Sequence, residues 1–384
     1  MNKPSIRSII VTAPQGLLPI LKNELKTLGF PIVWAGETAL GTCGTYYDTM
    51  KLNLWLRTAH HVHYQLNEFN CRNISELYRA VAAMPWESFI SPKGYISVTS
   101  SVDHPSIRDN RIVNLKCKDA IVDRIAAREG RRPDSGNEKK GAVIAVYWNK
   151  NRCSVSIDTS GDPLSKRGYR KIPLRAPMQE TLAAGVVQAT YFNGHQHFVN
   201  PMCGSGTLAI EAALIASCKA PGLTRKQFGF MHTLLFDEKS WRNLLNAAHS
   251  TVCNQGTNYR IIATDNDKKV VEAASTNAHA AGVHELIEFA VSDFMETTIP
   301  PGKGVIIFNP EYGIRLGTEE RLVMTYRSIG KFMKQCCRGY RGYVFTGNAT
   351  LAGNIGLKSG RKRKFQSGKI DCRLYEYDLY QGKR

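Results

Sequence analysis

The stretch Phe198-Val-Asn-Pro-Met-Cys-Gly-Ser-Gly-Thr207 decides how the second half of the chain is expected to fold. Its apolar start is typical of a buried strand, and its glycines are typical of the turn that follows such a strand. Gly204 and Gly206 let the backbone approach a ligand closely, because glycine has no side chain and tolerates left-handed conformations. An apolar helix is predicted directly after the turn. Strand, glycine turn and helix in this order are typical of a doubly wound α/β domain.

Alternating helices and strands continue from this turn to the C-terminus. The pattern predicts helices at 178–191, 208–217, 268–281 and 319–336, and strands at 198–200, 260–265, 287–291, 304–308 and 340–346. This alternation indicates a largely parallel sheet with helices on both faces. Residues 218–258 make the first crossover unusually long, and we expect them to be an insertion.

Two smaller α+β modules are expected before this domain. In the first, residues 1–62, the pattern predicts strands at 8–12, 32–40 and 43–47 and helices at 17–28 and 48–56. In the second, residues 63–160, it predicts strands at 63–69, 95–102, 143–148 and 154–158 and helices at 75–84 and 110–128. Asp48 and Ser75 are predicted to cap helices. The inner face of the last helix is expected to hold Ile112, Leu115, Ala120, Ile121 and Ile125.

The composition favours a polyanionic partner. The 384 residues include 51 Lys and Arg against 32 Asp and Glu, a net charge of +19, which indicates nucleic acid first. No run approaches the roughly 20 apolar residues of a membrane helix, and no signal peptide is evident, so a cytoplasmic protein without a membrane partner is expected. The ten cysteines form no C-x-x-C pair and are expected to be reduced.

Polar side chains follow three of the predicted strands at their carboxyl ends, where doubly wound sheets bind ligands. Asn200 ends the first strand, and Asp265 ends the second, where a carboxylate can accept hydrogen bonds from both hydroxyls of a ribose. Asp293 follows the third strand and can accept from an adenine amino group. Each acid could instead cap the next helix, although Asp267 could take that role from Asp265.

The stretch Ile306-Ile-Phe-Asn-Pro-Glu-Tyr-Gly313 predicts a buried strand that runs into a polar and aromatic tip. The side-chain oxygen of Asn309 and the carbonyl of Pro310 can accept both N–H groups of a nucleobase amine and restore lone-pair character to its nitrogen. Tyr312 can stack on a base taken out of its helix or loop. The alternative is an ordinary Asn-Pro turn. With the glycine turn, the tip predicts methyl transfer from S-adenosylmethionine by positioning alone, with no metal.

One basic stretch is a candidate for phosphate contact. Residues 356–373 hold seven basic residues against one acid, and they follow the predicted base-binding tip. A solvated surface is the alternative. Residues 108–132 hold eight basic and four acidic residues, so half of that charge is offset.

These motifs resemble those of the THUMP-domain RNA methyltransferases, and within them the bacterial enzymes that methylate guanine N2 in large-subunit ribosomal RNA, in a stand-alone form. The resemblance covers essentially the whole chain. It rests on Lys166-Arg-Gly-Tyr-Arg170, on Ala176-Pro-Met-Gln-Glu-Thr-Leu-Ala-Ala184, on Asn200–Thr207 and on Asp371-Cys-Arg-Leu-Tyr375. It implies a ferredoxin-like module at 1–62, a THUMP domain at 63–160 and a Rossmann-like methyltransferase domain at 165–384.

The resemblance also implies roles for individual residues. Asn309, Pro310 and Tyr312 would hold the target base. The residues expected to bind S-adenosylmethionine are Gln179, Glu180, Thr181, Asn200, Cys203, Gly204, Gly206, Thr207, Asp265, Asn266, Asp293 and Phe294. The residues expected to contact RNA are Lys166, Arg167, Arg170, Arg361, Lys362, Arg363 and Lys364.

The chain departs from the family pattern at two positions. Asn200 stands where many members have an acid, and Glu311 stands where the usual tip has a second proline. Transfer RNA is the nearest alternative substrate, because THUMP modules also occur in enzymes that modify it. A non-catalytic RNA-binding or ribosome-assembly factor, which Glu311 alone favours, and a protein-glutamine methyltransferase remain as rival functions.

Overall fold

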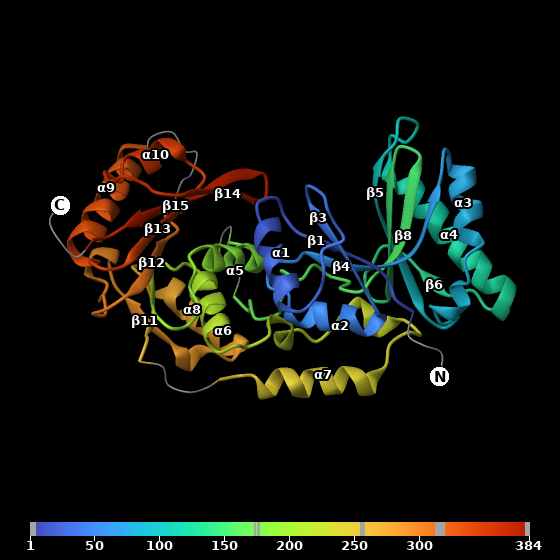
Figure 1. Ribbon diagram of the computed structural model, residues 1–384, viewed down its shortest axis with the longest axis horizontal. Coiled ribbons are helices and arrows are strands. Elements are labelled where there is room, and N and C mark those ends of the chain that lie inside the picture. Colours follow the sequence, from blue (N-terminus) through green and yellow to red (C-terminus); the bar gives the residue numbers. More distant parts are fainter. Residues whose placement is uncertain (1–4, 173, 175–176, 254–257, 312–318, 381–384) are drawn as a thin grey trace. The chain divides into compact units, whose positions relative to one another are not determined.

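The computed structural model describes residues 5–172, 174, 177–253, 258–311 and 319–380, and the chain divides into two compact units. Unit 1 comprises residues 1–13, 22–166 and 225–247, and unit 2 comprises residues 14–21, 167–224 and 248–384. Figure 1 shows the elements in chain order by colour. Within the described ranges, no helix is both long and apolar enough to span a membrane.

Unit 1 is built on one mixed sheet that joins the two predicted N-terminal modules. Its strands are β1 (Arg7–Thr12), β2 (Trp34–Ala35), β3 (Ala39–Gly44), β4 (His61–Asn70), β5 (Tyr95–Asp103), β6 (Asp134–Ser135), β7 (Ala142–Asn149) and β8 (Arg152–Asp158). Their order in the described part of the sheet is β2-β3-β1-β4-β8-β7-β5-β6. Strand β4 pairs antiparallel with β1 on one side and with β8 on the other, so the two modules share a continuous ladder.

The helices of this part of the chain are α1 (Leu18–Thr27), α2 (Tyr46–Trp55), α3 (Ile74–Ala82) and α4 (Asn110–Glu129). Two predicted helix caps were wrong. Thr45, not Asp48, is the N-cap of α2, and the two residues form a capping box in which the Asp48 carboxylate accepts from the Thr45 amide at 2.7 Å. Asn73, not Ser75, caps α3 by accepting from the Glu76 amide at 2.9 Å.

One further prediction in unit 1 was wrong, and another was wrong for two of its five residues. The strand expected at 43–47 is absent from the described structure, because β3 runs on through Gly41 to Gly44 and α2 begins at Tyr46. On α4, Ile112 and Leu115 are 49% and 51% exposed. Ala120, Ile121 and Ile125 are buried as predicted, and Val113, Cys117 and Val122 complete the buried face of α4.

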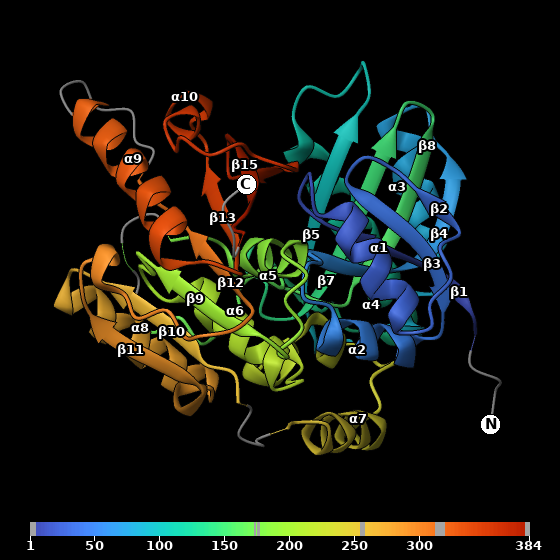
Figure 2. The ribbon, with the colours of Figure 1, turned by 60° about the vertical axis from the view of Figure 1, so that its left-hand side comes forward.

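Unit 2 contains the predicted doubly wound sheet. Its strands are β9 (His197–Pro201), β10 (Ile261–Asp265), β11 (Ile287–Val291), β12 (Gly304–Phe308), β13 (Arg341–Thr346), β14 (Lys362–Ser367) and β15 (Ile370–Asp378). The described order is β11-β10-β9-β12-β13-β15-β14 (Figures 1 and 2). Strands β9 to β13 are parallel, and β15 is antiparallel to both of its neighbours. The chain order reverses between β9 and β12, and such a switch point forms a ligand crevice in this architecture.

The helices of unit 2 are α5 (Glu180–Ala189), α6 (Thr207–Ala216), α8 (Lys268–Ala281), α9 (Glu319–Cys336) and α10 (Ala349–Gly353). The α/β prediction is therefore confirmed. The hairpin of β14 and β15 was not predicted, because basic residues hid the strand pattern at 362–367. This hairpin makes β14 an edge strand of the described sheet.

The long first crossover leaves the sheet of unit 2, as an insertion would, but its middle part belongs to unit 1. Helix α7 (Glu238–Ser250) follows a short aromatic segment there. Phe228 and Phe230 stack, and Trp241 packs edge-on against both, with ring centroids 5.0–5.4 Å apart. The Thr233 hydroxyl lies 2.7 Å from the Tyr46 hydroxyl, and the Leu234 amide donates to the Phe89 carbonyl.

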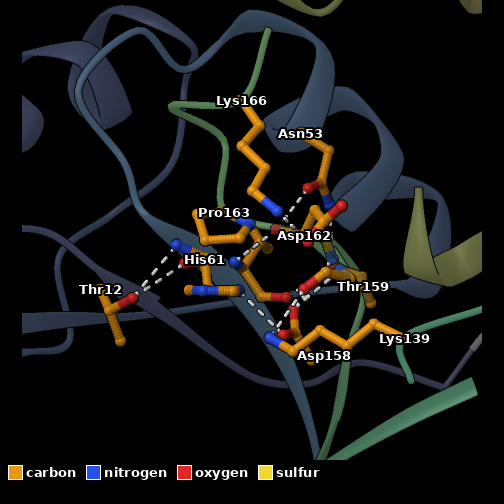
Figure 3. A network of polar contacts seen from close by, with 12 residues as sticks. Thr12, Asn53, His61, Lys139, Asp158, Thr159, Asp162, Pro163 and Lys166 are labelled. Atoms are coloured by element: carbon orange, nitrogen blue, oxygen red, sulfur yellow. Dashed lines mark hydrogen bonds and ion pairs between the residues drawn. The ribbon is translucent and has the colours of Figure 1, made fainter. Parts of the chain in front are cut away.

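A buried polar network holds the chain where it leaves β8 (Figure 3). Asp158 is 1% exposed, and one carboxylate oxygen lies 2.8 Å from Nδ1 of His61 on β4. Its other oxygen accepts from the amide of Ser160 at 3.0 Å, and the Ser160 hydroxyl donates to Asn53 of α2 at 2.6 Å. Burial alone would raise the pKa of Asp158, but the charge and hydrogen bond of His61, together with the charges of His63 and Lys139, outweigh burial and hold the pKa below its usual value.

Candidate active site

The glycine-rich turn between β9 and α6 has backbone conformations that explain its residues. Gly204 and Gly206 have φ values of +56° and +78°, in the left-handed region that favours glycine. A Cβ on Gly206 would lie 2.9 Å from the Cβ of Ala274 on α8. A Cβ on Gly204 would meet no described atom within 4 Å. The turn is thus closed by a helix at Gly206 and open at Gly204.

Asp265 lies at the end of β10 and faces this turn. Its Oδ2 accepts from the amide of Gly204 at 3.0 Å. Asp267 caps α8 instead, by accepting from the amide of Lys269 at 2.8 Å. Asp267 rather than Asp265 is therefore the cap of α8. The Asp265 carboxylate lies beside the glycine-rich turn, and its contact with the ribose hydroxyls stays a prediction.

Asp293 is a helix cap, which is the alternative role that the sequence left open. It caps the short 3-10 helix Phe294–Glu296 by accepting from the amide of Met295 at 2.8 Å. Phe294 turns inward and packs edge-on against Phe308 at 6.0 Å and Phe332 at 6.2 Å between ring centroids. The cap leaves the second carboxylate oxygen of Asp293 for another donor, so its contact with an adenine amino group stays a prediction.

Three buried side-chain atoms of the predicted site find no hydrogen-bond partner among the described residues. They are Oγ1 of Thr181, Oδ1 of Asn200 and Oδ1 of Asn309. Buried polar atoms in native proteins are nearly always paired, so these three atoms are open to a partner such as a ligand or a bound water. Asn200 and Asn309 lie at the carboxyl ends of the adjacent parallel strands β9 and β12. Both predicted ligand sites thus carry an acceptor oxygen at one edge of the sheet.

The structure gives a reason for Asn200 where many relatives have an acid. Its Nδ2 donates to the carbonyl of Ile307 on β12 at 3.0 Å, and the residue is completely buried. A carboxylate could not donate this hydrogen bond, which ties β9 to β12 at the switch point. The Asn200 Nδ2 group therefore joins the two strands, while Oδ1 has no partner among the described residues.

Arg170 was predicted to contact RNA, but the structure gives its guanidinium another task. It donates to the Glu180 carboxylate at 3.0 Å, to the Ser205 hydroxyl at 3.0 Å, to the Thr207 hydroxyl at 3.3 Å and to the Met178 carbonyl at 2.8 Å. Burial raises the pKa of Glu180, and the charge of Arg170 opposes that effect. Arg170 thus ties the lead-in segment and the start of α5 to the glycine-rich turn.

Arg167 was also predicted to contact RNA, and this prediction was wrong. The residue is 1% exposed, and its Nε donates to the Glu211 carboxylate of α6 at 2.8 Å. The Tyr169 hydroxyl donates to the same carboxylate at 3.0 Å. Because a buried guanidinium that is paired in this way cannot reach a phosphate, Arg167 belongs to the core. The exposed Lys166 pairs with Asp162 at 3.0 Å and keeps its RNA-binding prediction.

The remaining predicted residues differ in where they lie and in how exposed they are. Cys203 and Thr207 are buried in the turn, whereas Gln179 and Asn266 are exposed, and Pro310 is buried beside Asn309. Arg361, Lys362, Arg363 and Lys364 lie at or on the edge strand β14. Tyr312 lies outside the described residues.

Sequence reasoning missed Asn277, which supports the site from α8. This residue is 1% exposed, accepts from the amides of Lys171 and Ile172 at 2.8 and 3.1 Å, and donates to the Ser205 carbonyl at 3.3 Å. It fixes the lead-in segment against the glycine-rich turn. A polar residue on the apolar face of a predicted helix was the available signal.

Comparison with family models gives three matches along the chain. A model described as RMKL-like, methyltransferase domain, matches residues 167–376. A model of the RlmL ferredoxin-like domain matches residues 8–63, and a THUMP domain model matches residues 71–158.

Individual relatives agree with these matches. The chain is 34% identical over 380 residues to the ribosomal RNA large subunit methyltransferase K/L of Syntrophotalea carbinolica, covering 96% of this chain and 53% of the relative. The chain thus spans about half the length of that curated relative. The chain also matches a crystal structure of SMU.472, described as a methyltransferase complexed with SAH, at 26% identity and a TM-score of 0.88. The match covers 99% of this chain and 100% of SMU.472. A predicted N6-adenine-specific DNA methylase from Listeria monocytogenes is 30% identical, with 98% and 97% coverage of the two chains and a TM-score of 0.87.

Proposed function

Because the chain belongs to the RMKL-like methyltransferase family, we propose that it transfers a methyl group from S-adenosylmethionine to the exocyclic N2 amine of a guanine in RNA. The observation that carries this proposal is the buried Oδ1 of Asn309, which has no partner among the described residues and follows β12 at the switch-point edge. An acceptor in that position suits an amine that must be oriented and desolvated.

The residues of the glycine-rich turn fit S-adenosylmethionine. The open space beside Gly204 allows the methionine part of the cofactor to approach the backbone closely. Asp265 accepts one hydrogen bond from Gly204, and its carboxylate can accept further ones from the ribose hydroxyls. The relative of known structure with SAH supports this assignment. When bound, the cofactor supplies an electrophilic methyl group on a sulfonium.

The chain's own residues would prepare the amine. Asn309 Oδ1 and the Pro310 carbonyl would accept its two N–H groups, which draws the nitrogen away from conjugation with the ring. Alignment of the nitrogen with the methyl group then provides most of the rate enhancement. As the N–C bond forms and the C–S bond breaks, the amine loses one proton, which would pass to solvent or to the exposed carboxylate of Glu311 in the tip.

Large-subunit ribosomal RNA is the favoured substrate. The name of the Syntrophotalea relative, the match to a THUMP domain and the net charge of +19 support RNA. Transfer RNA remains the nearest alternative, and the description of the Listeria relative adds adenine N6 of DNA as a further substrate to test.

The decisive experiment supplies the purified chain and methyl-labelled S-adenosylmethionine with large-subunit ribosomal RNA, transfer RNA or duplex DNA. Each product is then digested to nucleosides and analysed by mass spectrometry. We expect label in N2-methylguanosine from the ribosomal RNA. Label found only in transfer RNA would show that transfer RNA is the substrate. Label in N6-methyladenine would show that the enzyme methylates adenine instead of guanine. Cofactor binding without any label would favour a non-catalytic RNA-binding factor.

A further inference from the structure

Tyr191 follows α5 in an unusual backbone conformation. Its φ is +59°, in the left-handed region that a bulky side chain rarely adopts. Its amide donates to the Gln188 carbonyl at 3.0 Å, as in an ordinary helix ending. Glycine would make the same turn without strain. Strain of this kind at a surface position points to a role for the side chain.

The Tyr191 ring is held by two arginines, one just before the edge strand β14 and one on it. Arg361 Nη1 and Arg363 Nη2 donate to the Tyr191 hydroxyl at 2.8 and 2.7 Å. The Arg363 guanidinium lies 5.0 Å from the ring centroid, in a cation–π contact. The tyrosine is nevertheless 51% exposed. A guanidinium has five N–H donors, so most of each group remains available to a second acceptor.

Alternation along β14 separates this cluster from the two lysines of the same strand. Arg361 and Arg363 share one face, whereas Lys362 and Lys364 point to the other, because side chains alternate along a strand. Lys362 Nζ lies 5.6 Å over the Tyr375 ring there. The register of the ladders places Glu376 and Asp378 of β15, and Arg341 of β13 opposite Asp378, on the arginine face as well. Three arginines against two acids leave this face positive.

We propose that Tyr191, Arg361 and Arg363 form a docking site for an unpaired segment of RNA. The half-exposed ring offers a stacking surface for a base, and the two guanidinium groups lie at its edge to bind phosphates. This inference rests on the proposed function in taking RNA as the ligand. It goes beyond that function by assigning Tyr191 and by separating the arginines from the lysines.

The docking site is separate from the reacting groups. Helix α5 starts at Glu180, beside the glycine-rich turn, and ends just before Tyr191. Its 10 residues span about 15 Å. The site should therefore set RNA affinity and leave the chemical step unchanged.

The test compares variants of the full chain by filter binding to transcribed large-subunit ribosomal RNA over a salt series. Tyr191→Gly should weaken RNA binding by roughly 5- to 100-fold, the range for one stacked base, without lowering the melting temperature. Tyr191→Phe should retain most of the affinity. Arg361→Gln with Arg363→Gln should lower the slope of log affinity against log salt by about 1.4, which is about 0.7 for each of two phosphates of a single strand, whereas Lys362→Gln with Lys364→Gln, the same charge change, should lower it by less than about 0.5.

The outcomes separate this inference from the function beneath it. Unchanged affinity of Tyr191→Gly, or equal slopes for the two double variants, would overturn the docking site while the wild-type chain still binds and methylates RNA. A wild-type chain that binds no RNA would overturn both. A slower single-turnover rate at saturating RNA would also contradict docking, because it would place Tyr191 in the chemistry.

Discussion

At the scale of single residues, the unpaired oxygens are the most informative feature of unit 2. Asn200 and Asn309 each carry a buried Oδ1 without a described partner, although Asn200 uses its amide group to bridge β9 and β12. The sequence predicted both residues from their position after strands. It could not predict that Arg167 would be buried. An arginine in a basic linker gives the same sequence pattern whether its side chain contacts solvent, a phosphate or, as here, the carboxylate of Glu211.

Asn309 provides the residue-scale prediction. Asn309→Ala should lower the single-turnover methylation rate by about 10²-fold or more, because it removes an acceptor aimed at the reacting amine. Asn309→Asp keeps an acceptor oxygen and should retain more activity. The affinity for S-adenosylmethionine, measured by calorimetry, should be nearly unchanged in both. A wild-type rate for the alanine variant would remove Asn309 from the reaction, and a parallel loss of cofactor affinity would assign it to the cofactor instead.

At the scale of elements, the glycine-rich turn was predicted well because its constraints are local. Gly204 and Gly206 need left-handed φ values, and Asp265 ends a short apolar strand. The elements that were missed depend on distant partners. Strand β14 is basic on both faces and is held in the sheet by pairing with β15. The elements that cover α4 decide that Val113 and Cys117 are buried instead of Ile112 and Leu115.

The two glycines of the turn should respond differently to the same substitution. Gly206→Ala should lower the free energy of unfolding by about 2–4 kcal/mol, because it adds a left-handed alanine and a Cβ 2.9 Å from Ala274. Gly204→Ala should cost only about 1–2 kcal/mol, since its Cβ meets no described atom, but it should weaken S-adenosylmethionine binding more than Gly206→Ala does. Denaturant unfolding and calorimetry measure the two effects. Equal cofactor affinities for the two variants would contradict the placement of the cofactor against Gly204.

The end of β8 and strand β4 should make folding sensitive to pH. Burial, with a smaller effect of the His61 charge, lowers the pKa of His60 to about 4, and burial lowers that of His63 to about 4. The unfolded chain takes up these protons below about pH 6.5, whereas the folded chain does so only near pH 4. The free energy of unfolding should therefore fall as the pH falls through that window, by about 1–2 kcal/mol for each histidine at pH 5.

Thermal unfolding between pH 7.5 and 4 checks this dependence. The double variant His60→Gln with His63→Gln should show a flatter decline than the wild type. The ionised Asp158 carboxyl, whose pKa is depressed in the folded chain, also stabilises the fold. This stabilisation should be lost at still lower pH, where the carboxyl is protonated. Parallel curves for wild type and variant would show that these two histidines do not cause the effect.

At the scale of the whole molecule, sequence boundaries and structural units differ. The sequence places a methyltransferase domain at 165–384, and the RMKL-like model matches 167–376. Yet residues 225–247 cluster with unit 1, and residues 14–21 cluster with unit 2. Segments that are exchanged in this way leave no signal in local composition, because the pairing partners lie far away along the chain.

This exchange predicts how a truncated chain will behave. Residues 165–384 alone should aggregate or unfold easily, because Phe228, Phe230 and Trp241 would lose the surroundings that bury them in unit 1. Replacing 225–247 by a short Gly-Ser linker, and adding no other change, should restore a monomer that binds S-adenosylmethionine. That monomer should still methylate ribosomal RNA poorly, since it lacks the THUMP match at 71–158. Size-exclusion chromatography, calorimetry and the methylation assay report the three properties. A stable monomer of 165–384 without the linker would show that the aromatic segment does not depend on unit 1, and full activity of the linked form would place substrate choice in unit 2.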